Sequence, residues 1–251
     1  MNRPTLTRLL ACLGLMATLS AVPALAQTSP PPPDFSAAER LLLMGDQLKQ
    51  VQPPTTLRYH FQHGGTLETP FEDQVSIQLT RQADGKCCAA TGEFLTGERR
   101  VTLPEVENAQ GNPVTLYFLE HDIREMQRLT KGQANYFRKR IRMALYQGAQ
   151  VRDVRFSYRG QSLAGQEIVI EPYLDDPNRV RFEQLARKQY VFLMSDAVPG
   201  SVVAIRTSAS AEGSASPLIE DTLWIDGATR PAPTASASAS AALKRTQPLR
   251  P

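Results

Sequence analysis

The chain has 251 residues, of which 41% are hydrophobic and 21% are charged, and its formal net charge is +3. Residues 1–26 and 230–251 together carry six basic side chains and no acid, so residues 27–229 sum to −3. The body of the chain is therefore slightly acidic, which argues against a dedicated nucleic-acid-binding protein, whose basic charge lies on its folded domain. The three cysteines are too few for a framework of disulfides, so a hydrophobic core must hold the fold.

The N-terminus has the pattern of a secretory signal peptide. Two arginines precede an apolar run over residues 9–19, which is too short to span a bilayer, and the small residues Ala24 and Ala26 follow it. We expect cleavage after Ala26 and a periplasmic or secreted mature protein. The residues around Cys12 loosely resemble a lipoprotein signal, but most of the apolar run follows this cysteine, whereas a lipoprotein signal would end there.

Composition divides the rest of the chain into three parts. Residues 27–34 form a proline-rich leader, residues 35–228 a single domain, and residues 229–251 a low-complexity tail of proline, alanine and serine that we expect to be disordered. No segment after the signal peptide is apolar enough to cross a membrane, so we expect a soluble mature protein without a transmembrane segment.

The first half of the domain predicts one helix and then strands. Ser36 and Glu39 can form a capping box, and Pro53-Pro54 is expected to end the helix that follows. Residues alternate between apolar and polar over 57–62 and 75–80, which is typical of a sheet with one buried face. A further strand or two is expected over residues 93–103.

The second half predicts a helix pair and then strands again. Apolar side chains recur at helical spacing over residues 113–129 and 131–147, with a capping box at Thr130 and Gln133 between the two helices. Strands are expected around residues 154–158, 168–170, 180–182, 190–194 and 202–206, and an edge strand over 218–225. The predicted fold is α+β, with a curved antiparallel β-sheet packed on the central helix pair and an N-terminal helix.

A group of basic residues on the second helix of the pair is the first candidate site. Guanidinium groups bind phosphate and carboxylate bidentately, so this group, with a nearby tyrosine, is a candidate site for an anionic ligand. The alternative is a solvated helix face that pairs with acidic residues on neighbouring strands. The residues of this candidate site are Lys131, Arg138, Lys139, Arg140, Arg142 and Tyr136.

Cys87 and Cys88 are the second candidate site. Adjacent Cα atoms lie about 3.8 Å apart across a trans peptide, closer than most disulfides require. The pair is therefore either a vicinal disulfide in the loop after Asp84-Gly85, a redox-sensitive pair, or a source of intermolecular bridges. A structural or incidental role remains the alternative to all redox chemistry.

The remaining titratable residues form no known catalytic, cofactor or metal signature. His60 and His63 lie three apart on a predicted strand and so point to opposite faces, which is poor geometry for one metal ion. A surface role is expected for these two and for His121. Solvated loops or helix ends also explain the acidic pairs, such as Asp122 with Glu125. We therefore assign no catalytic residue, no metal and no cofactor.

Two runs resemble a known group of sequences. They are NPVTLYFLEHDIREMQRLTKGQANYFRKRIR over residues 112–142 and KQYVFLMSDAVPG over residues 188–200. Both are similar to stretches of uncharacterised secreted or periplasmic proteobacterial proteins with no assigned activity. The resemblance covers about a fifth of the chain. It implies a location and a family, and it offers no catalytic residue to transfer.

Three functions follow from these features. The first is a non-catalytic protein of the cell envelope that binds a lipid or another amphiphilic or anionic envelope component in a groove between the helices and the sheet. The second is a protein–protein accessory or assembly factor of an envelope complex. The third is an enzyme with an unfamiliar site. A wide apolar cleft favours the first, a filled core with an exposed apolar patch the second, and a cleft with buried carboxylates or histidine the third.

Overall fold

The computed structural model describes residues 35–82, 85, 87–214 and 216–232. The expected signal peptide, the proline-rich leader and most of the low-complexity tail lie outside these residues. Within the described residues the search for membrane-spanning helices finds no helix that is long and apolar enough to cross a bilayer.

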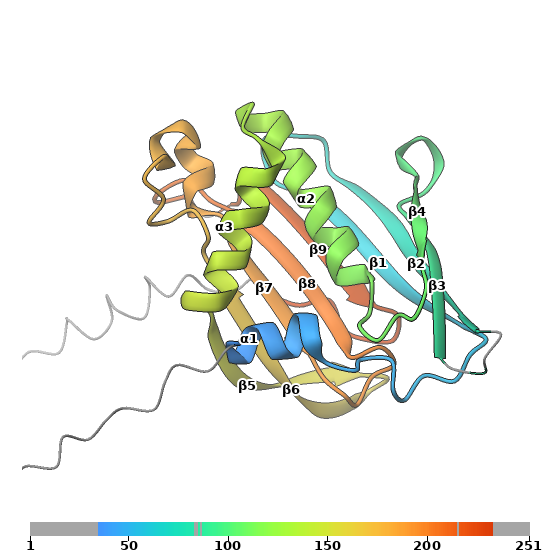
Figure 1. The fold of residues 1–251 in the computed structure, drawn as a ribbon. Coiled ribbons are helices and arrows are strands. Elements are labelled where there is room, and N and C mark those ends of the chain that lie inside the picture. The colour runs from blue at the N-terminus through green and yellow to red at the C-terminus, as the bar shows by residue number, and fades with distance from the viewer. Residues whose placement is uncertain (1–34, 83–84, 86, 215, 233–251) are drawn as a thin grey trace, which may run out of the picture. The chain divides into compact units, whose positions relative to one another are not determined.

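Nine strands form one antiparallel sheet in the order β4-β3-β2-β1-β9-β8-β7-β6-β5, and the sheet is curved but not closed (Figure 1). The predicted α+β class with a curved antiparallel sheet is therefore confirmed. The strands are β1 (Thr55–Gly64), β2 (Phe71–Arg81), β3 (Cys87–Phe94), β4 (Val101–Val106), β5 (Gln150–Tyr158), β6 (Gln161–Ile170), β7 (Gln189–Met194), β8 (Val202–Ala209) and β9 (Ile219–Ile225).

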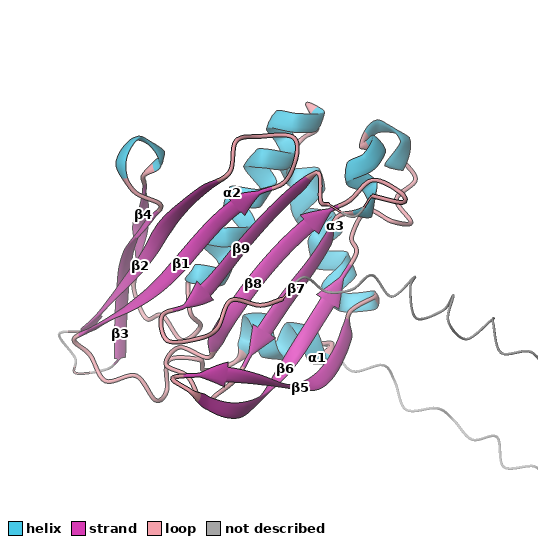
Figure 2. Ribbon diagram, turned by 180° about the vertical axis from the view of Figure 1, so that it is seen from behind, coloured by secondary structure: helices cyan, strands magenta, loops and turns pink. Residues whose placement is uncertain are grey.

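The helices form a layer on one face of this sheet, and the view from behind shows the strands in front of them (Figure 2). The predicted helix pair is α2 (Val114–Thr130) and α3 (Ala134–Gln147), close to the expected bounds. The N-terminal helix α1 (Ala37–Glu39) continues as the π-helix η1 (Arg40–Met44). The short 3₁₀ helices are η2 (Gly97–Arg99), η3 (Arg179–Arg181) and η4 (Glu183–Arg187).

Alternation along the strands places the core as predicted. In β1, Leu57, Tyr59 and Phe61 are buried beneath the helices, whereas Arg58 and His60 point to the other face. Their neighbours across the β1–β2 ladder follow the same alternation, because directly opposite residues in an antiparallel pair share a face. The helix-facing side of the sheet is therefore apolar over most of its width.

The N-terminal helix is shorter than the sequence predicts. The capping box is present, since the Ser36 hydroxyl accepts a hydrogen bond from the Glu39 backbone N–H (3.1 Å) and Glu39 accepts one from the Ser36 N–H (2.9 Å). The helix nevertheless ends before Gly45 and not at Pro53-Pro54. Leu48, at the spacing expected of a longer helix, is buried in the turn that follows instead. Tertiary burial after the end of the helix thus gives the same apolar spacing as a longer helix would. The sequence pattern alone cannot distinguish the two.

The junction between α2 and α3 also differs in detail from the prediction. Lys131 ends α2 in the left-handed conformation, and Gln133 precedes α3 without a side-chain capping bond, so the expected capping box does not form. At the other end of α2, the Asn112 side-chain oxygen accepts a hydrogen bond from the Val114 N–H (3.2 Å). Asn112 thus caps the first turn of α2.

Two strand predictions are wrong. Residues 180–182 belong to η3 and the turn after it, where Val180 is 82% exposed while Phe182 packs into the core. The segment predicted as an edge strand is β9, which lies between β1 and β8 in the middle of the sheet. An alternation over only three residues is too short to specify a strand. A strand at the edge of a sheet cannot be distinguished from one at its centre until the pairing of the strands is known.

A buried ion pair lies where α2 meets the sheet. Asp122 on α2 contacts the Lys188 ammonium group, and its other oxygen accepts a hydrogen bond from the Tyr190 hydroxyl (2.6 Å). Asp122 is 0% exposed and Lys188 is 1% exposed. The expectation of a solvated helix acid is therefore wrong for Asp122, which follows Phe118 by four residues and so lies on the same buried side of α2.

We predict that Asp122→Ala destabilises the fold by about 3–5 kcal/mol, because it leaves the Lys188 ammonium buried without its counter-charge. Urea-induced unfolding of the purified protein measures this change. The matched control is Glu212→Ala, which removes the exposed partner of Arg187 and should change stability by less than about 1 kcal/mol. Equal losses in the two variants would contradict a special role for the buried pair.

Candidate functional site

The space between the helix pair and the sheet is filled by side chains. Phe118 of α2, Phe137 of α3, and Phe192 and Ile205 of the sheet are each 0% exposed. These side chains interdigitate as protein interiors do, at the packing density of organic crystals. The centre of the interface between the helix pair and the sheet is therefore closely packed.

A groove lies beside this packed centre, along α2, between this helix and α3 on one side and strands β3 and β4 of the sheet on the other. It encloses about 670 Å³, and residues of η1, β3, β4, α2 and α3 line it. Because α2 lies between α3 and β4 (Figure 1), the lining residues fall on two flanks of this helix. One flank has Leu116 and Leu145 between the helices, and the other has Val101 and Leu103 of β4 beside α2. We call this cavity the α2 groove.

The α2 groove is largely aliphatic, and part of its lining is open to solvent. Leu116 is 59% exposed and Leu43 of η1 is 44% exposed, although both are large apolar side chains. Deeper in the groove, Leu119, Ile123 and Ile141 are buried. An exposed apolar surface that continues into a cavity is typical of a ligand or partner site and unusual for an ordinary solvated surface.

The predicted basic residues do not form one surface. Arg138 and Arg142 are one helical turn apart on α3, and both line the α2 groove. Arg138 binds Glu120 of α2 bidentately, with distances of 3.0 Å from Nε and 2.6 Å from the terminal nitrogen. This hydrogen bond to Glu120 raises the pKa of Arg138. Arg124 of α2 also lines the groove, although it lies outside the predicted basic cluster.

The other members of the predicted cluster lie elsewhere. Arg140 turns to the opposite side of α3, where its Nε lies 2.8 Å from the buried carboxylate of Asp176 and donates a hydrogen bond to the Pro172 carbonyl (3.1 Å). Tyr136 donates a hydrogen bond to the same Asp176 (2.6 Å). Lys131 is the C-cap of α2, and Lys139 is exposed outside the groove. Consecutive helical residues point about 100° apart, which separates Arg140 from Arg138 and Arg142.

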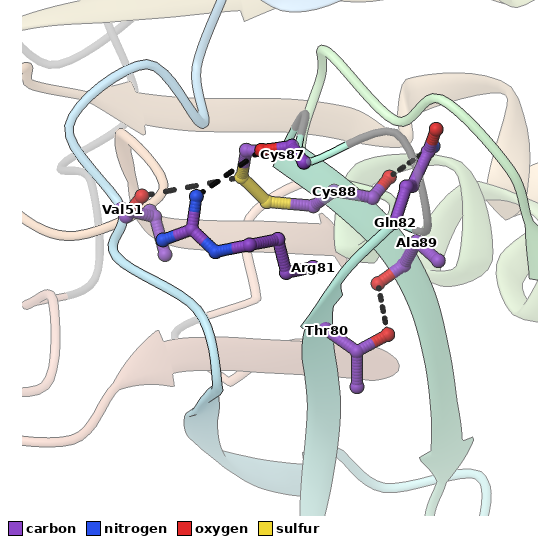
Figure 3. Close-up of a disulfide and its surroundings, with 8 residues drawn as sticks. Val51, Thr80, Arg81, Gln82, Cys87, Cys88 and Ala89 are labelled. Carbon is purple, nitrogen blue, oxygen red and sulfur yellow. Dashed lines mark hydrogen bonds between the residues drawn. A yellow bond between two sulfur atoms is a disulfide. The ribbon is translucent and has the colours of Figure 1, made fainter.

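Cys87 and Cys88 are joined by a disulfide, shown in Figure 3. They are the first two residues of β3, so the pair does not lie in the loop as predicted. Cys88 is buried in the core, whereas Cys87 is exposed and its Sγ lies 3.9 Å from the Val51 carbonyl oxygen. The pair thus lies at the start of β3 beside the segment that precedes β1, and neither cysteine lines the α2 groove.

A histidine–carboxylate cluster is the group that sequence reasoning missed. His63 Nδ1 lies 2.6 Å from Asp221 on β9, and His63 Nε2 lies 3.4 Å from Glu68. His121, which lines the α2 groove, approaches the other Asp221 oxygen at 3.9 Å. His63 is only 3% exposed, so the predicted surface role is wrong for it. Its side chain continues the buried alternation of Tyr59 and Phe61, which is the signal that could have revealed it.

His60 behaves as predicted. It lies on the opposite face of β1 from His63, stacked on Trp224 with ring centroids 5.2 Å apart. Within the described part of the chain, the histidines, cysteines and acids form no group of three or more suited to a metal ion.

Comparisons with known proteins identify no family for this chain. No family model matches it, and the curated proteins contain no match. Among solved structures it is similar to the crystal structure of the lipoprotein LppX from Mycobacterium tuberculosis, with a TM-score of 0.29 and 9% sequence identity. That similarity covers 73% of this chain and 91% of LppX. Because the TM-score is low, the function is derived from this chain's own residues alone.

The His63–Asp221 contact predicts a pH-dependent stability. The hydrogen bond to Asp221 raises the pKa of His63 above its ordinary value of 6.5, against the opposing effect of burial, and the nearby Glu68 and Glu125 act in the same direction. A raised folded-state pKa means that the stabilisation is fully present below about pH 6.5 and is lost as the pH rises through the folded pKa. Urea unfolding of the wild type between pH 5.5 and 9 should show this loss.

The variant His63→Gln is the control for that measurement. It should be less stable than the wild type at pH 5.5, and the difference between the two should shrink as the pH rises. An NMR titration of the wild type measures the His63 pKa directly, and Asp221→Asn should lower it. A stability difference that is constant over this pH range would contradict the assignment.

Proposed function

We propose that this chain is a non-catalytic protein of the cell envelope, periplasmic or secreted, and that it holds an amphiphilic ligand in the α2 groove. The observation that carries the proposal is the groove itself, an aliphatic cavity with exposed leucines at its opening and a filled core behind it. Its volume of about 670 Å³ lies within the range of about 300–1,000 Å³ typical of small-molecule sites.

The exposed leucines support an occupant with an apolar part. Complete burial of a leucine side chain is favourable by about 1.5–3 kcal/mol. A ligand that covers the exposed parts of Leu43 and Leu116 therefore gains part of this free energy on binding. An acyl chain provides such cover along both flanks of α2. The charged residues at the groove supply polar contacts at its edge, which is the combination that an amphiphile requires.

The lining chemistry supports binding over catalysis. Most of the lining side chains are aliphatic or aromatic, and Glu120 and Glu125 are each bound by an arginine. His121 has Asp221 near it, but its ring packs against Phe61 and Phe94, with centroids 5.5 and 5.1 Å away. These aromatic contacts support a packing role for His121 at the base of the groove.

The envelope location rests on the signal-like N-terminus and is supported by the oxidised cysteine pair. Disulfides persist in the periplasm and outside the cell, whereas the cytosol keeps thiols reduced. The Cys87–Cys88 disulfide therefore fits the compartment that the signal-like N-terminus predicts.

A second candidate function is a protein-binding module of an envelope complex. The specific observation that favours it is that Met44 (52%), the chain neighbour of Leu43, is a further large apolar side chain of η1 exposed to solvent. An amphipathic helix of a partner protein could place its apolar side chains on such a surface.

Native mass spectrometry of the protein purified from a periplasmic extract without detergent tests the proposal. We expect an added mass that disappears on denaturation and that extracts into organic solvent. A bare monomer mass would contradict an amphiphile carrier, and co-purification of a protein that binds at Leu116 would support the second candidate. The denatured mass also shows whether Cys87 and Cys88 lack two hydrogens, as their disulfide requires.

The variant Leu116→Asp should abolish the added mass, because a carboxylate in the aliphatic flank must be desolvated when the ligand binds. The matched control is Val180→Asp, which places the same charge on an 82% exposed apolar residue of η3 outside the groove. Both sites are exposed, so both variants should fold. Equal loss of ligand from both would show that the ligand binds elsewhere.

A further inference from the structure

More arginines than carboxylates line the α2 groove. Three arginines line it, Arg124, Arg138 and Arg142, together with the carboxylates of Glu120 and Glu125. Glu125 is already bound by Arg128 outside the groove (2.6 Å). Glu120 therefore remains the carboxylate that faces three guanidinium groups.

That one carboxylate is occupied by two of the arginines. Arg138 binds it bidentately, and Arg124 approaches it at 3.7 Å from the same helix. Arg142 has no carboxylate within ion-pair distance among the described residues, and it is exposed. Its guanidinium is therefore available to an anion that enters from solvent.

The position of Arg142 places this charge at an apolar boundary. It lies on the helical turn after Arg138, in the flank of the groove that Leu116, Leu145 and Leu43 also line. Guanidinium groups bind carboxylates and phosphates through two parallel hydrogen bonds. A ligand with an acyl chain over these leucines would thus bring its head group to Arg142.

We propose that the ligand of the α2 groove is an anionic amphiphile whose carboxylate or phosphate head group is bound by Arg142, with Arg124 and Arg138 beside it. This inference rests on the proposed function and names its ligand class. Arg140 cannot contribute, because Asp176 and the Pro172 carbonyl hold it on the far side of α3. Lys139 lies on the same helix but does not line the groove, so it is the matched control.

The test compares three ligands that share a twelve-carbon chain: dodecanoate, dodecyl phosphate and the uncharged monododecanoylglycerol. Binding is measured as displacement of the uncharged fluorescent probe N-phenyl-1-naphthylamine from the purified full-length protein at low ionic strength. Each ligand is used below its own critical micelle concentration. We expect at least one anionic ligand to bind about tenfold more tightly than the uncharged one. Preference for dodecyl phosphate would indicate a phospholipid-type head group, and preference for dodecanoate a fatty acid.

The variant Arg142→Gln should weaken binding of the preferred anionic ligand about tenfold and change binding of the uncharged ligand less than about twofold. Lys139→Gln should leave both unchanged. Equal affinities for all three ligands would overturn the head-group assignment and leave the groove as a binding site. Equal effects of the two variants would indicate general attraction of anions and would also overturn it. Failure of all three ligands to bind would contradict the proposed function itself.

Discussion

A buried ion pair joins the helix layer to the sheet, and the arrangement around the α2 groove depends on it. Asp122 reaches from α2 to Lys188, just before β7, and to the Tyr190 hydroxyl, which in turn lies 3.1 Å from the hydroxyl of Tyr173. Burial raises the pKa of Tyr190 well above its ordinary value, and Asp122 adds to this shift, so the hydroxyl remains a donor. A buried charge is stable only when its counter-charge lies next to it. The pairing of Asp122 with Lys188 therefore fixes the rotation of α2 over the sheet.

That rotation decides where a ligand can bind. With Phe118, Asp122 and Met126 directed at the sheet, the buried side of α2 is fully used by the core. Glu120 then faces Arg138 of α3, Tyr117 donates a hydrogen bond to the Pro104 carbonyl of β4, and His121 packs on Phe94 of β3. The apolar surface that remains therefore lies along the two sides of α2. A small shift of α2 would cover Leu116 or expose Phe118, so the groove and the core are two consequences of one packing arrangement.

The candidate site could be predicted only in part from the sequence. Arg138 and Arg142 were identifiable because a basic helix face is a known anion-binding feature, and their spacing of four residues places them together. Arg140 does not belong to that surface, because the rotation of the helix directs it to Asp176, which is distant from it in the chain. Arg124 and His121 were missed as members, since their place in the groove depends on β4 and α3, which are brought together by folding alone.

Local sequence patterns specify the two long helices, most strands, the Ser36 capping box and the α+β class. These follow from periodicity and capping chemistry, which act over a few residues. Packing of these elements sets the central position of β9, the burial of His63 and Asp122, and the place of the groove along α2. Strand pairing, burial of charge and cavity shape depend on contacts between residues far apart in the chain, so no local pattern can specify them.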